Sequence, residues 1–224
     1  MARTFAIGDI HGCNKTFQKL LLDKICIQKS DKIYCIGDYI DRGNDSKGVI
    51  DFILTLRKKG YQIHTLRGNH EQLMIDSIQS EEKFKHWIKN GGDETLKSFR
   101  ISSYDKMKPV YKDFFKRTKY FIKSGKFIFV HAGLNFQTAF PFEDKHSMLW
   151  IRDFEIDKQR LGNRFIIHGH TPKPMEFITK QQGKSAVNID GGCVFKNNVA
   201  LGNLIALNIT EGKLIAVRNI DSEE

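Results

Sequence analysis

Three stretches decide the fold of this chain: TFAIGDIHG (residues 4–12), KIYCIGDYIDRG (32–43) and IHTLRGNHE (63–71). In each, a short run of apolar or β-branched residues ends in Gly and then in acidic or His residues, which is typical of a strand that enters a tight turn. Between the stretches, apolar residues recur at the three- and four-residue spacing of an amphipathic helix: Phe17, Leu20, Leu21 and Ile25, then Val49, Ile50, Ile53 and Leu56. The pattern predicts a βαβαβ unit with parallel strands covered by helices.

A polar segment and a second series of strands follow. Residues 72–119 carry scattered apolar anchors, one of them Trp87, and Gly91-Gly92 interrupts them, so we interpret this segment as a helical insertion. Strand patterns then return, the last ones expected to be antiparallel: KFIFVHAG (126–133), RFIIHGHTP (164–172), SAVNID (185–190), ALGNLIALNIT (200–210) and KLIAVRNI (213–220). The sequence predicts one α/β domain over residues 1–224, with the insertion at about 72–119.

The composition fits one soluble globular domain, because 40% of the 224 residues are hydrophobic and 28% are charged. No apolar stretch reaches the ~20 residues that span a bilayer, and MARTFAIGDIHG lacks the long apolar region of a secretory signal. We therefore expect a cytoplasmic protein without a membrane partner. The net charge of +10 favours anionic partners, but no nucleic-acid-binding module is recognisable. The four cysteines form no C-x-x-C pair and are expected to be free thiols.

Polar side chains gather at the predicted strand ends. Ligands of parallel α/β sheets collect at the carboxyl ends of the strands, and the candidates there are Asp9, His11, Asp38, Asp41, Asn69, His70, His131, His168 and His170. Oxygen ligands mixed with imidazoles suit manganese, zinc or iron rather than calcium, and so many candidates exceed what one ion takes from a protein. We expect two ions, a carboxylate that bridges them, and a bridging hydroxide that attacks phosphorus.

Five motifs in this order, GDIHG, GDYIDRG, GNHE, VHAG and GHT, resemble the signatures of the metal-dependent phosphoprotein phosphatases in the calcineurin-like metallophosphoesterase superfamily. The match spans Gly8 to Thr171, and GNHEQLMID followed by NGGDET is similar to the compact bacterial or phage type. The resemblance implies a sandwich of two mixed β-sheets flanked by helices. It also implies two divalent ions, for which manganese is the first expectation and iron or zinc the alternatives.

The resemblance also implies a role for individual residues. Asp9 and His11 would bind the first ion, Asp38 would bridge both, and the second site would be completed by Asn69, His131 and His170. Three arginines would hold the phosphate oxygens, for which a guanidinium fork is well shaped: Arg42, Arg67 and Arg152. Because His70 adjoins a ligand, we expect it to protonate the leaving alkoxide, with Asp41 orienting it, and this pair also matches the family.

Each motif also has a plainer interpretation. A Gly followed by Asp at a strand end can simply cap the next helix, and the other candidates can be hydrogen-bonded turn residues. We place His168 in the core or behind the ligands, since it points to the opposite strand face from His170. Asp190 is either the partner of a ligand histidine or a turn-capping residue.

The leading functional hypothesis is a serine/threonine-type protein phosphatase acting on phosphorylated proteins or small phosphoesters. A symmetrical dinucleoside tetraphosphatase or another nucleotide phosphohydrolase is the alternative. A basic protein that keeps the fold but only binds polyanions is the non-enzyme alternative. The sequence contains no indication of the oligomeric state.

Overall fold

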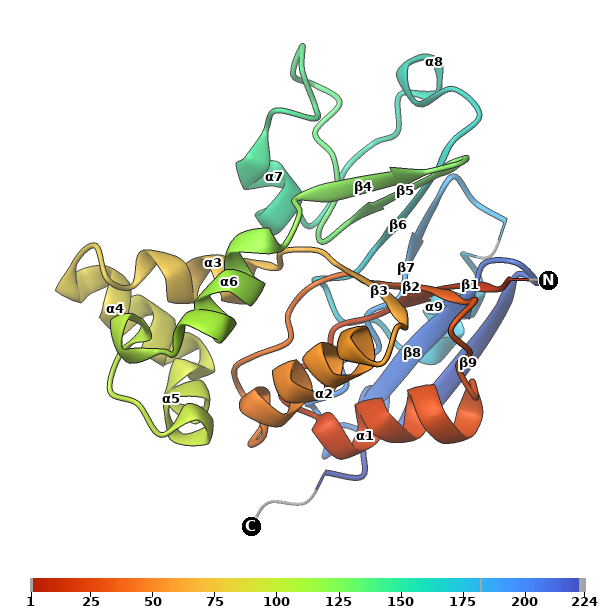
Figure 1. Cartoon of the computed structure of the whole chain (residues 1–224). Coiled ribbons are helices and arrows are strands. Elements are labelled where there is room, and N and C mark those ends of the chain that lie inside the picture. Colours follow the sequence, from red (N-terminus) through yellow and green to blue (C-terminus); the bar gives the residue numbers. More distant parts are fainter. Residues whose placement is uncertain (1, 182, 222–224) are drawn as a thin grey trace.

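The computed structural model describes residues 2–181 and 183–221, and two mixed β-sheets form its centre (Figure 1). The first sheet has the strand order β3-β2-β1-β8-β9 and contains β1 (Thr4–Ile7), β2 (Lys32–Cys35), β3 (Gln62–Thr65), β8 (Asn203–Asn208) and β9 (Lys213–Arg218). The second sheet has the order β4-β5-β6-β7 and contains β4 (Phe121–Ser124), β5 (Phe127–Val130), β6 (Phe165–His168) and β7 (Ala186–Asn188). The expected sandwich of two mixed sheets is confirmed.

Strand directions bring several carboxyl ends to one edge of each sheet. Strands β1, β2 and β3 run parallel, as the βαβαβ pattern predicted, and so do β5, β6 and β7. Strand β8 is antiparallel to both β1 and β9. Strand β4, which the sequence analysis missed, pairs with β5 as a hairpin around Gly125 (φ 57°). Its sequence FIKS has little pattern, because none of its residues is fully buried.

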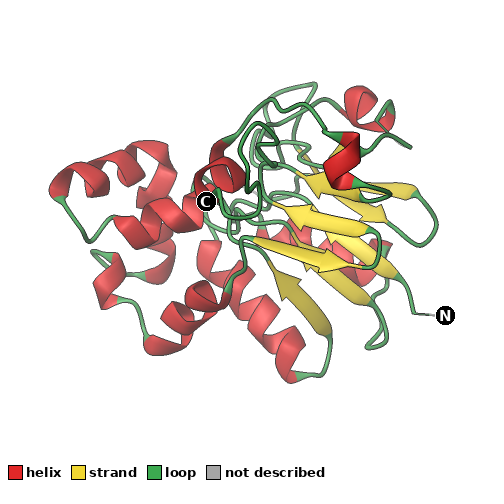
Figure 2. Cartoon of the chain, turned by 90° about the horizontal axis from the view of Figure 1, so that it is seen from above, coloured by secondary structure: helices red, strands yellow, loops and turns green. Residues whose placement is uncertain are grey.

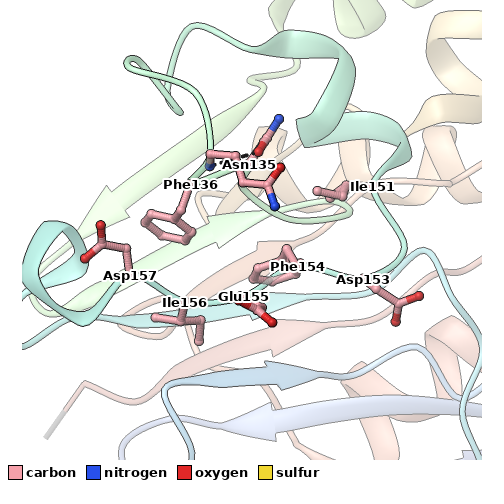
Figure 3. Close-up of a pocket in the computed structure, with 9 residues that line it drawn as sticks. Asn135, Phe136, Ile151, Asp153, Phe154, Glu155, Ile156 and Asp157 are labelled. Carbon is pink, nitrogen blue, oxygen red and sulfur yellow. Dashed lines mark hydrogen bonds between the residues drawn. The ribbon is translucent and has the colours of Figure 1, made fainter.

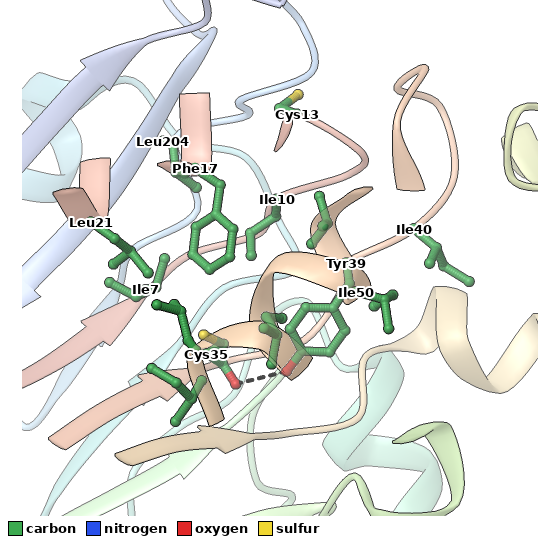
Figure 4. Close-up of a cluster of buried hydrophobic side chains, with 14 of the residues drawn as sticks. Ile7, Ile10, Cys13, Phe17, Leu21, Cys35, Tyr39, Ile40, Ile50 and Leu204 are labelled. Atoms are coloured by element: carbon green, nitrogen blue, oxygen red, sulfur yellow. Dashed lines mark hydrogen bonds between the residues drawn. The ribbon is translucent and has the colours of Figure 1, made fainter. Parts of the chain in front are cut away.

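Alternating side chains of the central strands fill two separate cores. Phe5 and Ile7 of β1 pack toward helices, in the cluster that Figure 4 shows, whereas Ala6 between them faces the other sheet. Tyr34 of β2 also points between the sheets, where its ring stacks on Phe129 of β5 with centroids 4.0 Å apart. The strict alternation fixes the register, because a slip of one residue would exchange the two faces.

Helices cover the first sheet and extend beyond it. Helix α1 (Asn14–Lys19) continues as a π-helical turn at Leu20–Lys24, and α2 (Ser46–Lys58) is capped by the Asp45 side chain, which accepts the Gly48 N–H. The other α-helices of the described residues are α3 (Asn69–Asp76), α4 (Glu81–Trp87), α5 (Asp93–Phe99), α6 (Pro109–Arg117), α7 (Lys145–Trp150), α8 (Lys158–Leu161) and α9 (Met175–Thr179). A π-helical turn (Ile88–Gly92) and a 3-10 turn (Tyr104–Lys106) lie between them. Figures 1 and 2 show α3 to α6 beside the sheets, on the side away from the N-terminus.

The break predicted at Gly91-Gly92 separates α4 from α5. Gly91 has a φ of 97°, and a Cβ there would lie 2.8 Å from the backbone nitrogen of Arg42. Only glycine therefore allows this turn to approach the loop after β2 so closely. None of the helices within residues 2–181 and 183–221 is long and apolar enough to cross a membrane.

Candidate active site

Loops at the carboxyl ends of β1, β2, β3, β5 and β6 converge on one cluster of polar side chains. The cluster contains Asp9, His11, Asp38, Asp41, Asn69, His70, His131 and His170, and all of these except His170 are buried. Several sit on strained backbone, with positive φ at His11, Asp38, Asp41 and His170. Strain of this kind is maintained only where the surrounding structure enforces it, and it is typical of functional loops.

Asp38 lies at the centre of the cluster. Its Oδ2 atom is 3.5 Å from Nε2 of His11 and 3.5 Å from Nε2 of His131. Asp38 belongs to two groups of possible metal ligands, and within each group all the ligand atoms lie within 4.8 Å of one another. The first group is His11, Asp38 and His70, and the second is Asp38, His131 and His170. Burial alone would raise the pKa of Asp38, but the surrounding imidazoles, led by His131, lower it below its ordinary value.

The tautomers of two histidines follow from their backbone partners. Nδ1 of His11 lies 2.9 Å from the carbonyl oxygen of Ile40, and Nδ1 of His131 lies 3.1 Å from that of Ile36. A carbonyl only accepts, so each Nδ1 carries the proton and each Nε2 keeps a lone pair directed at Asp38. Burial lowers the pKa of both rings, which favours their neutral form. A neutral imidazole fixed through its other nitrogen is the form that binds metals.

Two of the remaining metal-donor atoms of the cluster have no hydrogen-bond partner among the described residues. Oδ1 of Asn69 is 2.9 Å from both His131 Nε2 and His170 Nδ1. Asp9 accepts the backbone N–H of His170 through Oδ2, while its Oδ1 and Nε2 of His170 are buried with no hydrogen-bond partner among the described residues. Unpaired buried polar atoms are costly, and cations would compensate them. The donor set therefore fits divalent metal ions, although Asp9 belongs to neither of the two compact groups.

His70 and Asp41 form a buried pair beside these donors. His70 Nδ1 is 2.7 Å from Asp41 Oδ2, and the two side chains are 1% and 0% exposed. Burial lowers the pKa of His70, but the carboxylates of Asp38 and Asp41 outweigh it, so the pKa is raised. Two further side chains donate to Asp41, namely Trp87 and Thr95. The sequence analysis assigned Trp87 only as an apolar anchor, because nothing local in the sequence indicates its polar contact.

Glu71 is a second residue whose position the sequence analysis did not anticipate. Its carboxyl group is fully buried and accepts three backbone N–H groups, from Asp38 (2.9 Å), Tyr39 (2.8 Å) and Gly68 (2.8 Å). It thereby joins the loop after β2 to the loop after β3. Burial, and then the charge of Asp38, raise the pKa of Glu71 to about 8. The position of Glu after GNH was the available signal for this role.

Two of the three expected phosphate-binding arginines lie near the cluster. Arg42 is exposed, and its Nη1 is 3.2 Å from Nε2 of His11. Arg152 is also exposed and follows Trp150, whose ring meets that of His170 at 6.1 Å. Burial first, and then His131 and Arg152, lower the pKa of His170 to about 3. Arg152 is thus close enough for its charge to act on His170.

Arg67, the third arginine, is engaged elsewhere. Its guanidinium donates four hydrogen bonds, to Thr118 Oγ1, Gln72 Oε1, Tyr120 Oη and the carbonyl oxygen of Phe115. Only one of the five N–H groups of an arginine then stays free for a phosphate. The partners come from the segment around α3 and α6, which a motif-based expectation does not include.

Two residues with open roles are now located. His168 is buried at the end of β6, where its ring contacts that of Phe154 (centroids 5.2 Å apart), and it belongs to neither ligand group. Asp190 accepts the backbone N–H of Gly192 at 2.8 Å, which fits the turn-capping alternative. No hydrogen bond among residues 2–181 and 183–221 joins Asp190 to a ligand histidine.

A pocket of about 600 Å³ is lined by the residues on either side of Arg152 in the sequence, Ile151 and Asp153, among others (Figure 3). It is lined by Asn135, Phe136, Gln137, Ile151, Asp153, Phe154, Glu155, Ile156 and Asp157, which include three acidic residues and no basic one. The packing ties the pocket to the cluster, because a Cβ on Gly133 would lie 2.4 Å from the ring of Phe154. Gly133 follows His131 by two residues, so one lining residue of the pocket packs on the loop that carries a metal-ligand candidate.

Comparison with known proteins gives consistent results. Residues 2–202 match the family model described as calcineurin-like phosphoesterase. Serine/threonine-protein phosphatase 1 of Salmonella typhimurium is 27% identical over 209 residues, covering 89% of this chain and 91% of that protein. The asymmetrical bis(5'-nucleosyl)-tetraphosphatase PrpE of Oceanobacillus iheyensis is 26% identical over 222 residues, covering 86% of this chain and 85% of that protein.

The fold likeness extends to a solved structure. The cold-active protein-tyrosine phosphatase of a psychrophilic Shewanella species superposes with a TM-score of 0.66 at 16% identity, over all of this chain and 80% of that one. The family match covers nearly the whole chain and supports an enzyme, because the relatives that it resembles are phosphatases. The chain belongs to the calcineurin-like phosphoesterase family and is a metallophosphoesterase.

Proposed function

We propose that this chain is a metal-dependent serine/threonine-type protein phosphatase that hydrolyses phosphomonoesters. One observation carries the proposal: a single oxygen of Asp38 lies 3.5 Å from the imidazole nitrogens of both His11 and His131, and the buried His70–Asp41 pair adjoins it. Such an oxygen can belong to two metal sites at once. The neighbouring imidazole is then available for proton transfer.

The two ions would be held by residues from both sheets. Asp9, His11 and Asp38 would bind the first, and the second would be held by Asp38, Asn69, His131 and His170. Two divalent ions, manganese first among them, would activate water as the nucleophile and neutralise charge on the phosphoryl oxygens. The neutral imidazoles and the orphaned Asp9 and His170 atoms support this assignment.

His70 would protonate the leaving alkoxide. Asp41 holds Nδ1 of the ring, so Nε2 is the nitrogen that would deliver the proton. The carboxylates raise the pKa of His70, which favours the protonated ring that a general acid needs. Arg42 and Arg152 would hold the phosphate oxygens, and we propose only an auxiliary contact for Arg67 because four of its hydrogen bonds are already formed.

The relatives include a protein phosphatase and a dinucleoside tetraphosphatase, and the pocket around Ile151 and Asp153 favours the first. Its lining residues Asp153, Glu155 and Asp157 make it acidic, and it includes the neighbours in sequence of Arg152, to which we assign a phosphate contact. A polyphosphate chain that extended over this rim would be repelled. A peptide would place only one phosphate at the ions and could place a basic side chain in the pocket.

The test is a comparison of kcat/KM for a phosphoserine peptide and for diadenosine tetraphosphate, both with added Mn²⁺. We expect the higher value for the peptide. A higher kcat/KM for the tetraphosphate would replace the protein phosphatase by the nucleotide hydrolase while leaving the metal site intact. Hydrolysis of neither, with p-nitrophenyl phosphate also stable, would overturn the proposed function altogether.

A further inference from the structure

The helical insertion contributes two side chains to the proposed proton-transfer pair. We propose that Trp87 and Thr95 are positioning residues, which hold the Asp41 carboxylate in the one orientation that keeps His70 directed at the leaving group. This inference rests on the proposed function. It also gives the Gly91-Gly92 break a role, which is to let the insertion approach Asp41 closely.

The contacts of Asp41 leave its carboxylate little freedom. Thr95 Oγ1 donates to Oδ1 at 2.6 Å, and Trp87 Nε1 lies 3.1 Å from Oδ1 and 3.0 Å from Oδ2. His70 Nδ1 lies 2.7 Å from Oδ2. Both carboxylate oxygens are therefore engaged from two directions, and rotation of the group would break at least two bonds at once. Asp41, Trp87 and Thr95 are all 0% exposed, so water cannot replace a lost donor without reorganisation.

Thr95 is fixed in turn by the loop that it supports. The backbone N–H of Asp41 donates to Thr95 Oγ1 at 2.9 Å and also to Ser46 Oγ at 3.1 Å. The threonine hydroxyl therefore accepts from the Asp41 backbone while it donates to the Asp41 side chain. This double contact links the loop after β2, where φ of Asp41 is 70°, to helix α5.

The two glycines allow the insertion to approach closely enough. Gly91 accepts the backbone N–H of Arg42 at 3.1 Å, one residue after Asp41. A Cβ on Gly92 would lie 2.5 Å from the Trp87 ring, so a side chain there would displace the indole. The insertion is thus built to deliver Trp87 and Thr95 to the pair, rather than only to cover it.

The experiment compares variants on two substrates. Thr95→Val removes the hydroxyl at nearly constant shape, and Trp87→Phe removes the N–H but keeps an aromatic ring. Trp87→Phe removes the N–H shared by the two carboxylate oxygens, and Thr95→Val removes one bond to the carboxylate and one from the Asp41 backbone. For each variant, kcat on a phosphoserine peptide should therefore fall ~10- to 100-fold with KM nearly unchanged. The fall should be smaller on p-nitrophenyl phosphate, whose leaving group needs less proton transfer. Thr95→Ser should restore most of the peptide rate.

Ser98 offers a matched control on the same helix. Its Oγ accepts the backbone N–H of Lys47 at 2.9 Å, so it ties α5 to α2 without contacting Asp41. Ser98→Ala should keep the wild-type ratio of the two substrate rates. In an Asp41→Asn background, Thr95→Val should cause no further loss, because the group on which it acts is already changed.

A spectroscopic readout separates this inference from the proposed function. The Nδ1 proton of His70 should give a strongly deshielded ¹H NMR signal, absent in His70→Asn, that moves in Thr95→Val and Trp87→Phe but not in Ser98→Ala. An inactive wild type that shows these shifts would overturn the function and keep the positioning. Equal slowing on both substrates, additivity with Asp41→Asn, or an unmoved signal would overturn the positioning role.

Discussion

Replacing Glu71 by Gln tests how the two central loops are held together. The carboxyl oxygens accept N–H groups of Asp38, Tyr39 and Gly68, whereas the amide of Gln offers one oxygen and one NH₂ group. In the better orientation the oxygen takes the place of Oε2, which keeps two of the bonds and turns the NH₂ toward the Tyr39 N–H. One hydrogen bond is then lost, and two buried donors face each other.

The expected magnitude follows from this geometry. Burial, and then Asp38, raise the pKa of Glu71 to about 8, and we count its bonds at the value for a neutral acceptor, which is the lower of the two values. A lost neutral hydrogen bond costs ~1 kcal/mol and an unpaired buried donor ~1–3 kcal/mol, which gives about 2–4 kcal/mol in total. This is a large part of the ~5–15 kcal/mol that stabilises a typical domain.

Urea unfolding of metal-free protein at pH 7 measures this loss directly, because bound ions would add their own stabilisation. Glu82→Gln is the control, since Glu82 is exposed on α4 and should change the free energy of unfolding by less than ~0.5 kcal/mol. A Glu71→Gln protein as stable as the control would refute the role of Glu71 as the link between the two loops.

Three further outcomes are expected. Asp38→Asn should abolish turnover even after Mn²⁺ is restored, because one oxygen of Asp38 would serve both ions. Bound metal and hydrolysis rate are measured on the same variant, and wild-type-like turnover would contradict the prediction. His70→Asn should keep both ions and lose ~10²–10⁴-fold in rate on a phosphoserine peptide, but distinctly less on p-nitrophenyl phosphate. Loss of one ion, or equal slowing on both substrates, would make His70 a metal ligand or an electrostatic clamp. Burial alone would raise the pKa of Asp31, but its hydrogen bonds with Arg3, including one of 2.6 Å, outweigh burial and lower the pKa. The pair therefore stabilises the fold at pH values above the ordinary Asp pKa of ~4, and this stabilisation is lost as the pH falls through the lowered pKa of the folded state. Asp31→Asn should therefore lose stability at pH 7 and show a flatter decline toward pH 3 in urea unfolding, and parallel curves would speak against the pair.

Much of the fold was predictable because its signals are local. Strands β1 and β2 alternate between two cores. Each of the first three apolar runs leads into a glycine turn, so these runs and the helical spacing between them predicted the βαβαβ unit that the structure confirms. Strand β4 was not predicted, because FIKS is short and only half-buried and therefore shows no clear apolar pattern. The family and the two-sheet sandwich followed from five motifs in order and are confirmed, while the single domain and the roles of individual residues stay predictions.

The missed features depend on partners distant in sequence. Trp87 contacts Asp41 across 46 residues and Thr95 does so across 54, and no local pattern encodes either approach. The guanidinium of Arg67 is directed by α6, about fifty residues downstream. For Glu71, the sequence contained the GNHE motif, but it did not indicate the three backbone N–H groups that the side chain accepts.

The central claim is that two divalent ions share Asp38 and make this chain a phosphomonoesterase. The most direct measurement is a titration of chelator-treated protein with Mn²⁺, in which bound metal per chain and hydrolysis of p-nitrophenyl phosphate are followed in the same samples. We predict no activity without metal and a rate that reaches its maximum at two bound ions per chain. Full activity in the metal-free protein, or a maximum at one ion, would contradict the account.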